Sequence, residues 1–97
     1  MSFSWDQKKR EENWESRKVD FAEAVGIFDD PEVIESIDSR EHYGEERIQA
    51  LGKMDGVFYL VVHTWRDETR HIVTAWKARR TWQETIGSTI RAAKSRQ

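Results

Sequence analysis

Cationic and aromatic side chains are interleaved between Tyr43 and Arg80, and together they have the chemistry of an RNA-binding surface. Aromatic rings stack on unpaired bases, and Lys and Arg side chains neutralise phosphates. The cations are Arg47, Arg66, Arg70, Lys77, Arg79 and Arg80, and the aromatic residues are Tyr43, Trp65 and Trp76. Because the cations fall near expected strand ends and at the start of an expected helix, we expect them to converge at one edge of a sheet. The alternative, which composition alone favours, is that the tryptophans pack a helix on the sheet and the arginines are solvated.

Two histidines, His63 and His71, fall on two expected neighbouring strands and can face the same groove. Imidazole titrates near neutral pH, so either residue is a candidate for proton transfer, although a structural hydrogen-bonding role is more common for a strand histidine. The three histidines lack i,i+4 spacing and no carboxylate pattern completes a site, so we expect no metal and no cofactor.

The element expected to position these residues is a sheet centred on Val57–Thr64. Its first six residues are all apolar, which is typical of a strand buried on both faces. Turn signals at Asp55-Gly56 and a polar reversal before His71 predict hairpins on either side. The neighbouring strands are expected at Arg47–Leu51, His71–Ala75 and, at an edge, Val33–Asp38.

Helices are expected to cover this sheet. Asp6 is a candidate N-cap for a helix over about Gln7–Arg17, and Asp20 for a second helix with an apolar stripe over Phe21–Phe28. A last helix is expected from Lys77 to about Lys94. The sequence therefore predicts one α+β domain over residues 1–97, with two N-terminal helices, an antiparallel sheet of about four strands and a C-terminal helix. Phe3 and Trp5 suit a short first strand or an apolar anchor.

Charge is unevenly distributed along the chain. Residues 1–65 have 8 Lys and Arg against 15 Asp and Glu, a net charge of −7, whereas residues 66–97 have 8 against 3, a net charge of +5. The basic part is a candidate anion-binding surface, and the alternative is the solvated faces of two helices. The absence of cysteine, of a secretory segment and of an apolar span predicts a cytoplasmic protein that is not in a membrane.

Several segments, in order, resemble the BrnT family of toxins from bacterial type II toxin–antitoxin pairs. The resemblance covers about residues 5–82. The matching segments are Trp5-Asp6, Asn13, Val19–Ala24, Phe28–Pro31, Tyr43–Gly52, Leu60–Thr64, Arg66 and Ile72–Ala78.

This resemblance implies a RelE-like fold and a metal-independent endoribonuclease that inhibits translation. It also implies a BrnA-like antitoxin with a ribbon-helix-helix domain. Five tryptophans in 97 residues are hard to bury completely, so self-association as a homodimer is a further expectation.

The chain departs from the family pattern at several positions. The family's Lys-His-Gly is replaced by Ser16-Arg17-Lys18, its usual glutamate falls at Trp82, and two arginines of its closing motif are replaced by His71 and Trp76. The surviving residues imply catalytic roles for Arg47, Arg66 and Lys77, with His71 as a substitute, and RNA contacts for Arg70, Trp76, Arg79 and Arg80.

Metal-independent RNA cleavage, in which the ribose 2′-OH is the nucleophile, needs a proton acceptor for that hydroxyl and positive charge at the phosphorane. Tryptophan cannot replace a guanidinium, so we expect a toxin with weakened activity. The alternatives are a non-catalytic nucleic-acid or protein-binding module and an engineered sequence of the same fold.

Overall fold

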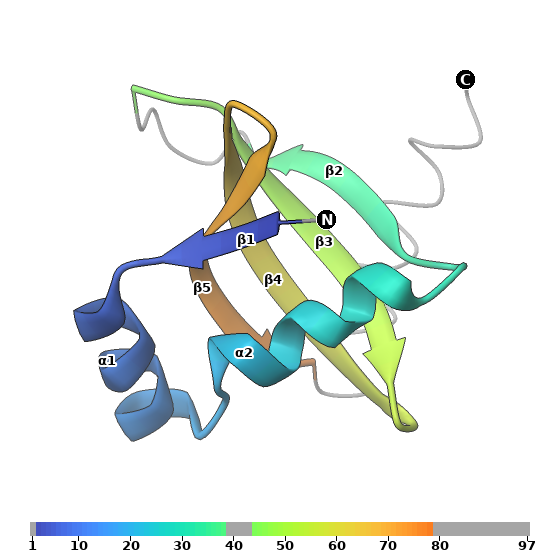
Figure 1. Ribbon diagram of the computed structural model, residues 1–97. Coiled ribbons are helices and arrows are strands. Elements are labelled where there is room, and N and C mark those ends of the chain that lie inside the picture. Colours follow the sequence, from blue (N-terminus) through green and yellow to red (C-terminus); the bar gives the residue numbers. More distant parts are fainter. Residues whose placement is uncertain (1, 39–43, 79–97) are drawn as a thin grey trace.

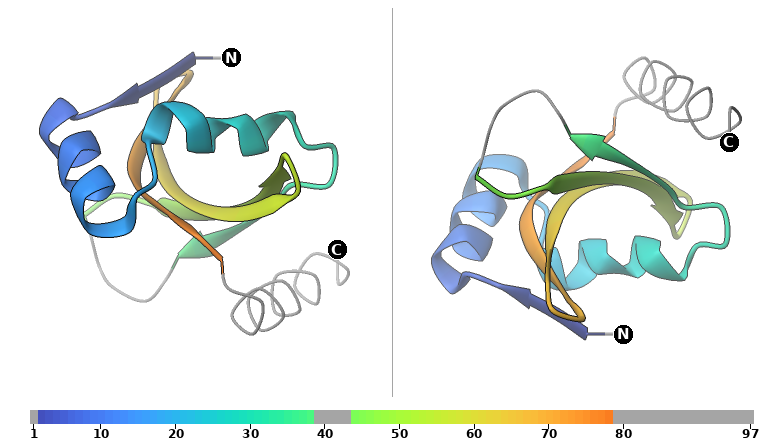
Figure 2. Two further views of the ribbon diagram at one scale, coloured as in Figure 1. Left: turned by 90° about the horizontal axis from the view of Figure 1, so that it is seen from below. Right: turned by 90° about the horizontal axis from the view of Figure 1, so that it is seen from above.

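The computed structural model describes residues 2–38 and 44–78, which form a curved five-stranded sheet with helices on one face and at one edge (Figure 1). The spatial order of the strands is β1-β5-β4-β3-β2. Their bounds are β1 Ser2–Trp5, β2 Ile34–Asp38, β3 Arg47–Met54, β4 Val57–Arg66 and β5 Thr69–Lys77. The strands curve around α2 (Phe21–Ala24) and the 3₁₀ helix η1 (Val25–Asp29), whereas α1 (Gln7–Arg17) packs beside β5 (Figure 2).

The apolar strand β4 lies at the centre of the sheet, as predicted. It pairs antiparallel with β3 and β5. The link from β3 is the two-residue turn Asp55-Gly56, with φ of 51° and 81°, and positive φ at both positions matches the twist of a hairpin. Each flanking strand is longer than predicted because the pairing continues beyond the apolar residues.

The two faces of the sheet have separate apolar clusters. On the helix face, Val61 and Ala75 pack with Phe21 and Ile27 from α2 and η1. On the opposite face, which we call the second face, Leu60 and Val62 form another buried cluster. The β4–β5 register shifts between Val62 and His63, so Ile72 and Ala75 both join the helix-face cluster although they are three residues apart.

Local capping sets the helix boundaries, as expected. Asp6 accepts a hydrogen bond from the Lys8 N–H at 2.9 Å, and Asp20 accepts one from Ala22 at 3.1 Å. Asp20 also accepts from the Arg10 guanidinium, and this bond lowers the pKa of the Asp20 carboxyl. Inside α1, the buried Asn13 donates to the carbonyls of Val19 and Ala75 at 2.9 and 2.8 Å, which fixes the helix to β5.

The predicted arrangement of helices and strands is wrong in several respects, although the α+β class is right. The sheet has five strands and is mixed, because β1 pairs with β5 in parallel, from Ser2 opposite Thr69 to Trp5 opposite Ile72. The second helix has one α-helical turn and continues as the 3₁₀ helix η1. The pairing of β1 with β5 joins segments more than 60 residues apart in the sequence, and no local sequence signal predicts it.

The predicted C-terminal helix begins too early, because Lys77 is the last residue of β5. The remainder of that predicted helix lies outside the described residues. Within 2–38 and 44–78, no helix is long and apolar enough to cross a membrane.

Candidate functional site

A row of polar side chains crosses the whole sheet on its second face. Directly paired residues of neighbouring strands point to the same face. Ser4 pairs with His71, His71 with Thr64, and Asp38 with Arg47. The β3–β4 register, with Ile48 opposite His63, places Arg47 opposite Thr64 and completes the row.

Three of the four predicted catalytic residues meet in and beside this row, and we call Arg47, Arg66 and His71 the cation patch. Arg47 and His71 lie two strands apart, roughly 10 Å between Cα atoms, and Arg66 lies two residues beyond Thr64, roughly 7 Å along β4. Arg66 is exposed, and Arg47 and His71 are partly buried. Long side chains at these spacings can contact the same phosphate or adjacent ones.

The His71 imidazole is poised to accept a proton. Desolvation by burial, followed by the nearby positive charge of Arg66, lowers the pKa of His71 below its ordinary value, and the carboxylates of Glu45 and Asp6 oppose this only in part. At neutral pH the ring is therefore mainly uncharged. Its Nδ1 is 2.9 Å from the Ser4 hydroxyl oxygen, which fixes the orientation of the ring.

Arg70 lies on the opposite side of the sheet, in a cluster of buried polar and aromatic groups. Its guanidinium carbon is 4.1 Å from the ring centre of Phe28 and 4.7 Å from that of Trp65. Its Nη2 is 3.5 Å from both Glu35 carboxylate oxygens, and Glu35 Oε1 also lies 2.8 Å from His63 Nε2. With Arg70 only 8 % exposed and His63 fully buried, this geometry favours a structural role for both residues. The assignment of Arg70 to RNA binding stays a prediction.

The other predicted site residues are not brought to the cation patch. Lys77 is exposed and opposite Tyr59, six residues along β5 from His71, roughly 20 Å away. Trp76 lies in the second-face cluster, and the guanidinium carbon of Arg17 is 4.7 Å from its ring centre. Arg79 and Arg80 lie outside the described residues.

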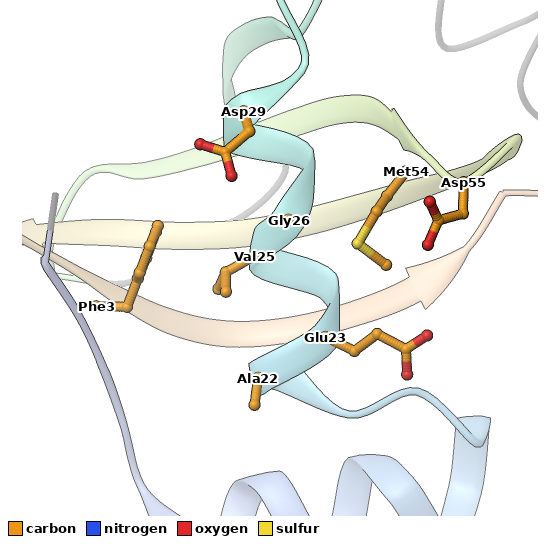
Figure 3. A pocket seen from close by; sticks show the side chains of 8 residues that line it. All are labelled: Phe3, Ala22, Glu23, Val25, Gly26, Asp29, Met54 and Asp55. Atoms are coloured by element: carbon orange, nitrogen blue, oxygen red, sulfur yellow. The ribbon is translucent and has the colours of Figure 1, made fainter.

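A cavity of about 590 Å³ lies over α2 and η1, and its charged lining residues are acidic, unlike those of a phosphate-binding site. Figure 3 shows the Met54 side chain beside Gly26, with the carboxylates of Glu23, Asp29 and Asp55 around them. Three carboxylates repel a polyanion, so this cavity does not suit RNA.

Ser4 and Thr64 belong to the site, yet the sequence interpretation did not select them. The signal for Ser4 is its alternation with Phe3 and Trp5, which places the two serines of this strand on one face. That face is identified only by the pairing with β5. Thr64 donates to the Glu46 carbonyl at 2.7 Å, which fixes the chain just before Arg47.

Residues 5–81 match the family described as ribonuclease toxin, BrnT, of type II toxin-antitoxin system. No curated protein matches the chain.

Proposed function

The chain belongs to the BrnT family of ribonuclease toxins of type II toxin–antitoxin systems, and we propose that it cleaves RNA at the cation patch without a metal ion. Family membership implies an RNA substrate and an antitoxin partner. The observation that supports this location best is that Arg47, Arg66 and His71, three of the four catalytic residues that the family resemblance implies, share one end of one sheet face.

In the proposed reaction, His71 accepts the proton of the ribose 2′-OH as the 2′ oxygen attacks the adjacent phosphorus. The bond from phosphorus to the 5′ oxygen breaks and leaves a 2′,3′-cyclic phosphate. The 5′ oxygen takes a proton from water to become a hydroxyl, and the His71 imidazolium gives its proton to the hydroxide that this forms. Arg47 and Arg66 stabilise the negative charge that develops on the phosphorane oxygens. His63 does not take part, because its side chain is fully buried on the other face. Lys77 can contact only a more distant part of the same RNA.

We further propose that cleavage inhibits translation in the cytoplasm, that the antitoxin has a ribbon-helix-helix domain, and that the toxin forms a homodimer. Exposed aromatic residues support protein contacts, since Trp14 and Trp65 are 48 % and 46 % exposed. Activity is proposed to be weakened through RNA binding, because Trp76, roughly 17 Å along β5 from His71, offers a ring already contacted by Arg17 in place of a guanidinium that could bind a more distant phosphate.

The test is cleavage of a single-stranded RNA by the purified protein in the presence of EDTA. Arg47→Ala and Arg66→Ala should each lower the rate by about 10²–10³, the usual effect of removing a preorganised donor. His71→Asn should lower it by about 10²–10⁴, and the wild-type rate should fall as the pH drops through the lowered pKa of His71. Lys53→Ala, a cation exposed at the far end of β3, is the matched control.

Three results of this assay decide between the candidates. Cleavage abolished by EDTA would contradict the metal-independent reaction. Binding of RNA without cleavage would favour the second candidate, a non-catalytic module of the same fold. If activity is weakened as proposed, Trp76→Arg should lower the KM for RNA, and an unchanged or higher KM would contradict the weakening.

A further inference from the structure

The N-terminal strand β1 supplies a hydroxyl to the proton acceptor of the cation patch. Ser4 pairs with His71 in the parallel β1–β5 register, and its Oγ lies 2.9 Å from His71 Nδ1. The strand is fixed from its other face, where the rings of Phe3 and Phe28 are 5.6 Å apart and those of Trp5 and Phe21 are 6.3 Å apart. Packing of the residues before and after Ser4 therefore sets the position of the hydroxyl.

We propose that Ser4 is a positioning residue for His71, whose Nδ1–H donates to Ser4 Oγ and leaves the Nε2 lone pair available to the RNA 2′-OH. This inference rests on the proposed function for the identity of the base. A neutral histidine has two tautomers, and only the one with a bare Nε2 can accept a proton at the nitrogen that lies away from β1.

Charged groups around His71 act on its protonation together with the Ser4–His71 hydrogen bond. The charged groups that act on the ring are Arg66 at the end of β4, Glu45 before β3 and Asp6 at the start of α1. Arg66 disfavours the imidazolium, whereas the two carboxylates favour it. Among the described residues, the recorded hydrogen-bond partner of the ring is the Ser4 hydroxyl, which contacts Nδ1.

The strand offers a matched control two residues away. Ser2 Oγ is 2.7 Å from Thr69 Oγ1, on the same pair of strands and the same face, and neither residue contacts His71 among the described interactions. Ser2→Ala therefore removes an equivalent hydroxyl from β1 without changing the histidine. Ser4→Thr keeps a hydroxyl and suits a strand.

The first experiment is ¹⁵N NMR of the imidazole in the full chain, which reports the tautomer and the pKa of His71 whether or not the protein cleaves RNA. The wild type and Ser4→Thr should show one tautomer, with the proton on Nδ1. Ser4→Ala should show a mixture and a lower pKa, since the lost acceptor stabilises the imidazolium most. Ser2→Ala should match the wild type.

The second experiment is the pH profile of RNA cleavage by the same four proteins. Ser4→Ala should lower kcat about tenfold with KM nearly unchanged, because the base is misplaced and RNA binding is not. The acid limb of the Ser4→Ala pH profile should move to lower pH. Ser4→Thr should restore both the wild-type kcat and the wild-type position of the acid limb. Thermal unfolding of Ser4→Ala and Ser2→Ala identifies any general loss of the fold.

Each outcome has a distinct meaning. A wild-type ring protonated on Nε2, a tautomer unchanged in Ser4→Ala, or an equal effect of Ser2→Ala would overturn the positioning role. If the NMR results are as expected while His71→Asn cleaves RNA normally, the proposed function of His71 fails and the hydrogen bond is structural.

Discussion

Arg66 and Arg70 are four residues apart in the sequence, yet they occupy opposite chemical environments. Arg66 is exposed on the second face, where its charge acts on His71. Arg70 is buried between two aromatic rings on the helix face and lies near the Glu35 carboxylate. An exposed guanidinium and one that is buried between aromatic rings therefore differ in their neighbours, and residue type alone does not separate them.

The charge of Glu35 is predicted to stabilise the fold through Arg70 and His63. Glu35→Gln keeps the shape of the side chain but leaves the buried guanidinium without its carboxylate. We expect the free energy of unfolding to fall by about 2 kcal/mol, below the usual cost of breaking a fully buried pair, because the Glu35 side chain is 35 % exposed. Chemical denaturation of both proteins measures this difference.

The control for this prediction is Glu32→Gln, which removes the same charge from an exposed position just before β2. Its effect should stay within about 0.5 kcal/mol. Equal stabilities of Glu35→Gln and Glu32→Gln would mean that solvent screens the Glu35 carboxylate and that its charge does not hold Arg70 in place.

At the scale of elements, two glycines allow η1 to lie close to β3. A Cβ atom on Gly52 would be 2.8 Å from Ile27 Cβ and 3.1 Å from the Ile27 carbonyl oxygen. A Cβ atom on Gly26 would instead meet Met54 Sδ at 2.2 Å, near the end of a flexible side chain. The first contact involves a branched side chain and backbone, which have little room to move.

Gly52→Ala is therefore expected to destabilise the protein by about 1–3 kcal/mol, because η1 must move away from the sheet. Gly26→Ala should cost clearly less, since Met54 can adopt another rotamer. Thermal or chemical unfolding of the two variants is the measurement. A larger loss for Gly26→Ala would show that Met54 is rigidly packed against η1.

For the whole molecule, the distribution of charge determines where a polyanion can approach. The first 65 residues have a net charge of −7, and three of their acidic residues, Glu23, Asp29 and Asp55, line the cavity over α2 and η1. The cation patch faces away from these helices, so the sheet separates the carboxylates of the cavity from Arg47, Arg66 and His71, although Asp38 and Glu45 lie next to Arg47. Net charge alone, at −2, predicts no such preference.

Salt dependence of binding tests this separation. With a non-cleavable single-stranded oligonucleotide, Arg66→Gln should reduce the slope of log affinity against log salt by about 0.7, the value for one phosphate contact. Lys53→Gln makes the same change in net charge at the far end of the sheet and should leave the slope nearly unchanged. Equal effects of the two variants would show that binding depends on overall charge and not on the cation patch.

The sequence by itself determined the features that depend on neighbours along the chain. The apolar run from Val57 predicts a central buried strand, Asp55-Gly56 predicts its hairpin, and Asp6 and Asp20 predict two helix starts. Each is an interaction between residues a few positions apart, so local physical chemistry is sufficient. The order of segments was also sufficient to indicate the family that the match over residues 5–81 confirms.

Only the tertiary structure decided which face each functional residue occupies. The parallel pairing of β1 with β5 brings Ser4 to His71 across 67 residues, and the register shift after Val62 changes which residues of β5 share a face. Strand pairing between distant segments depends on packing of the whole sheet, and a shift of one residue moves every side chain to the other face. For this reason the sequence identified Arg66, Arg70 and His71 together, and the fold separated Arg70 from the other two.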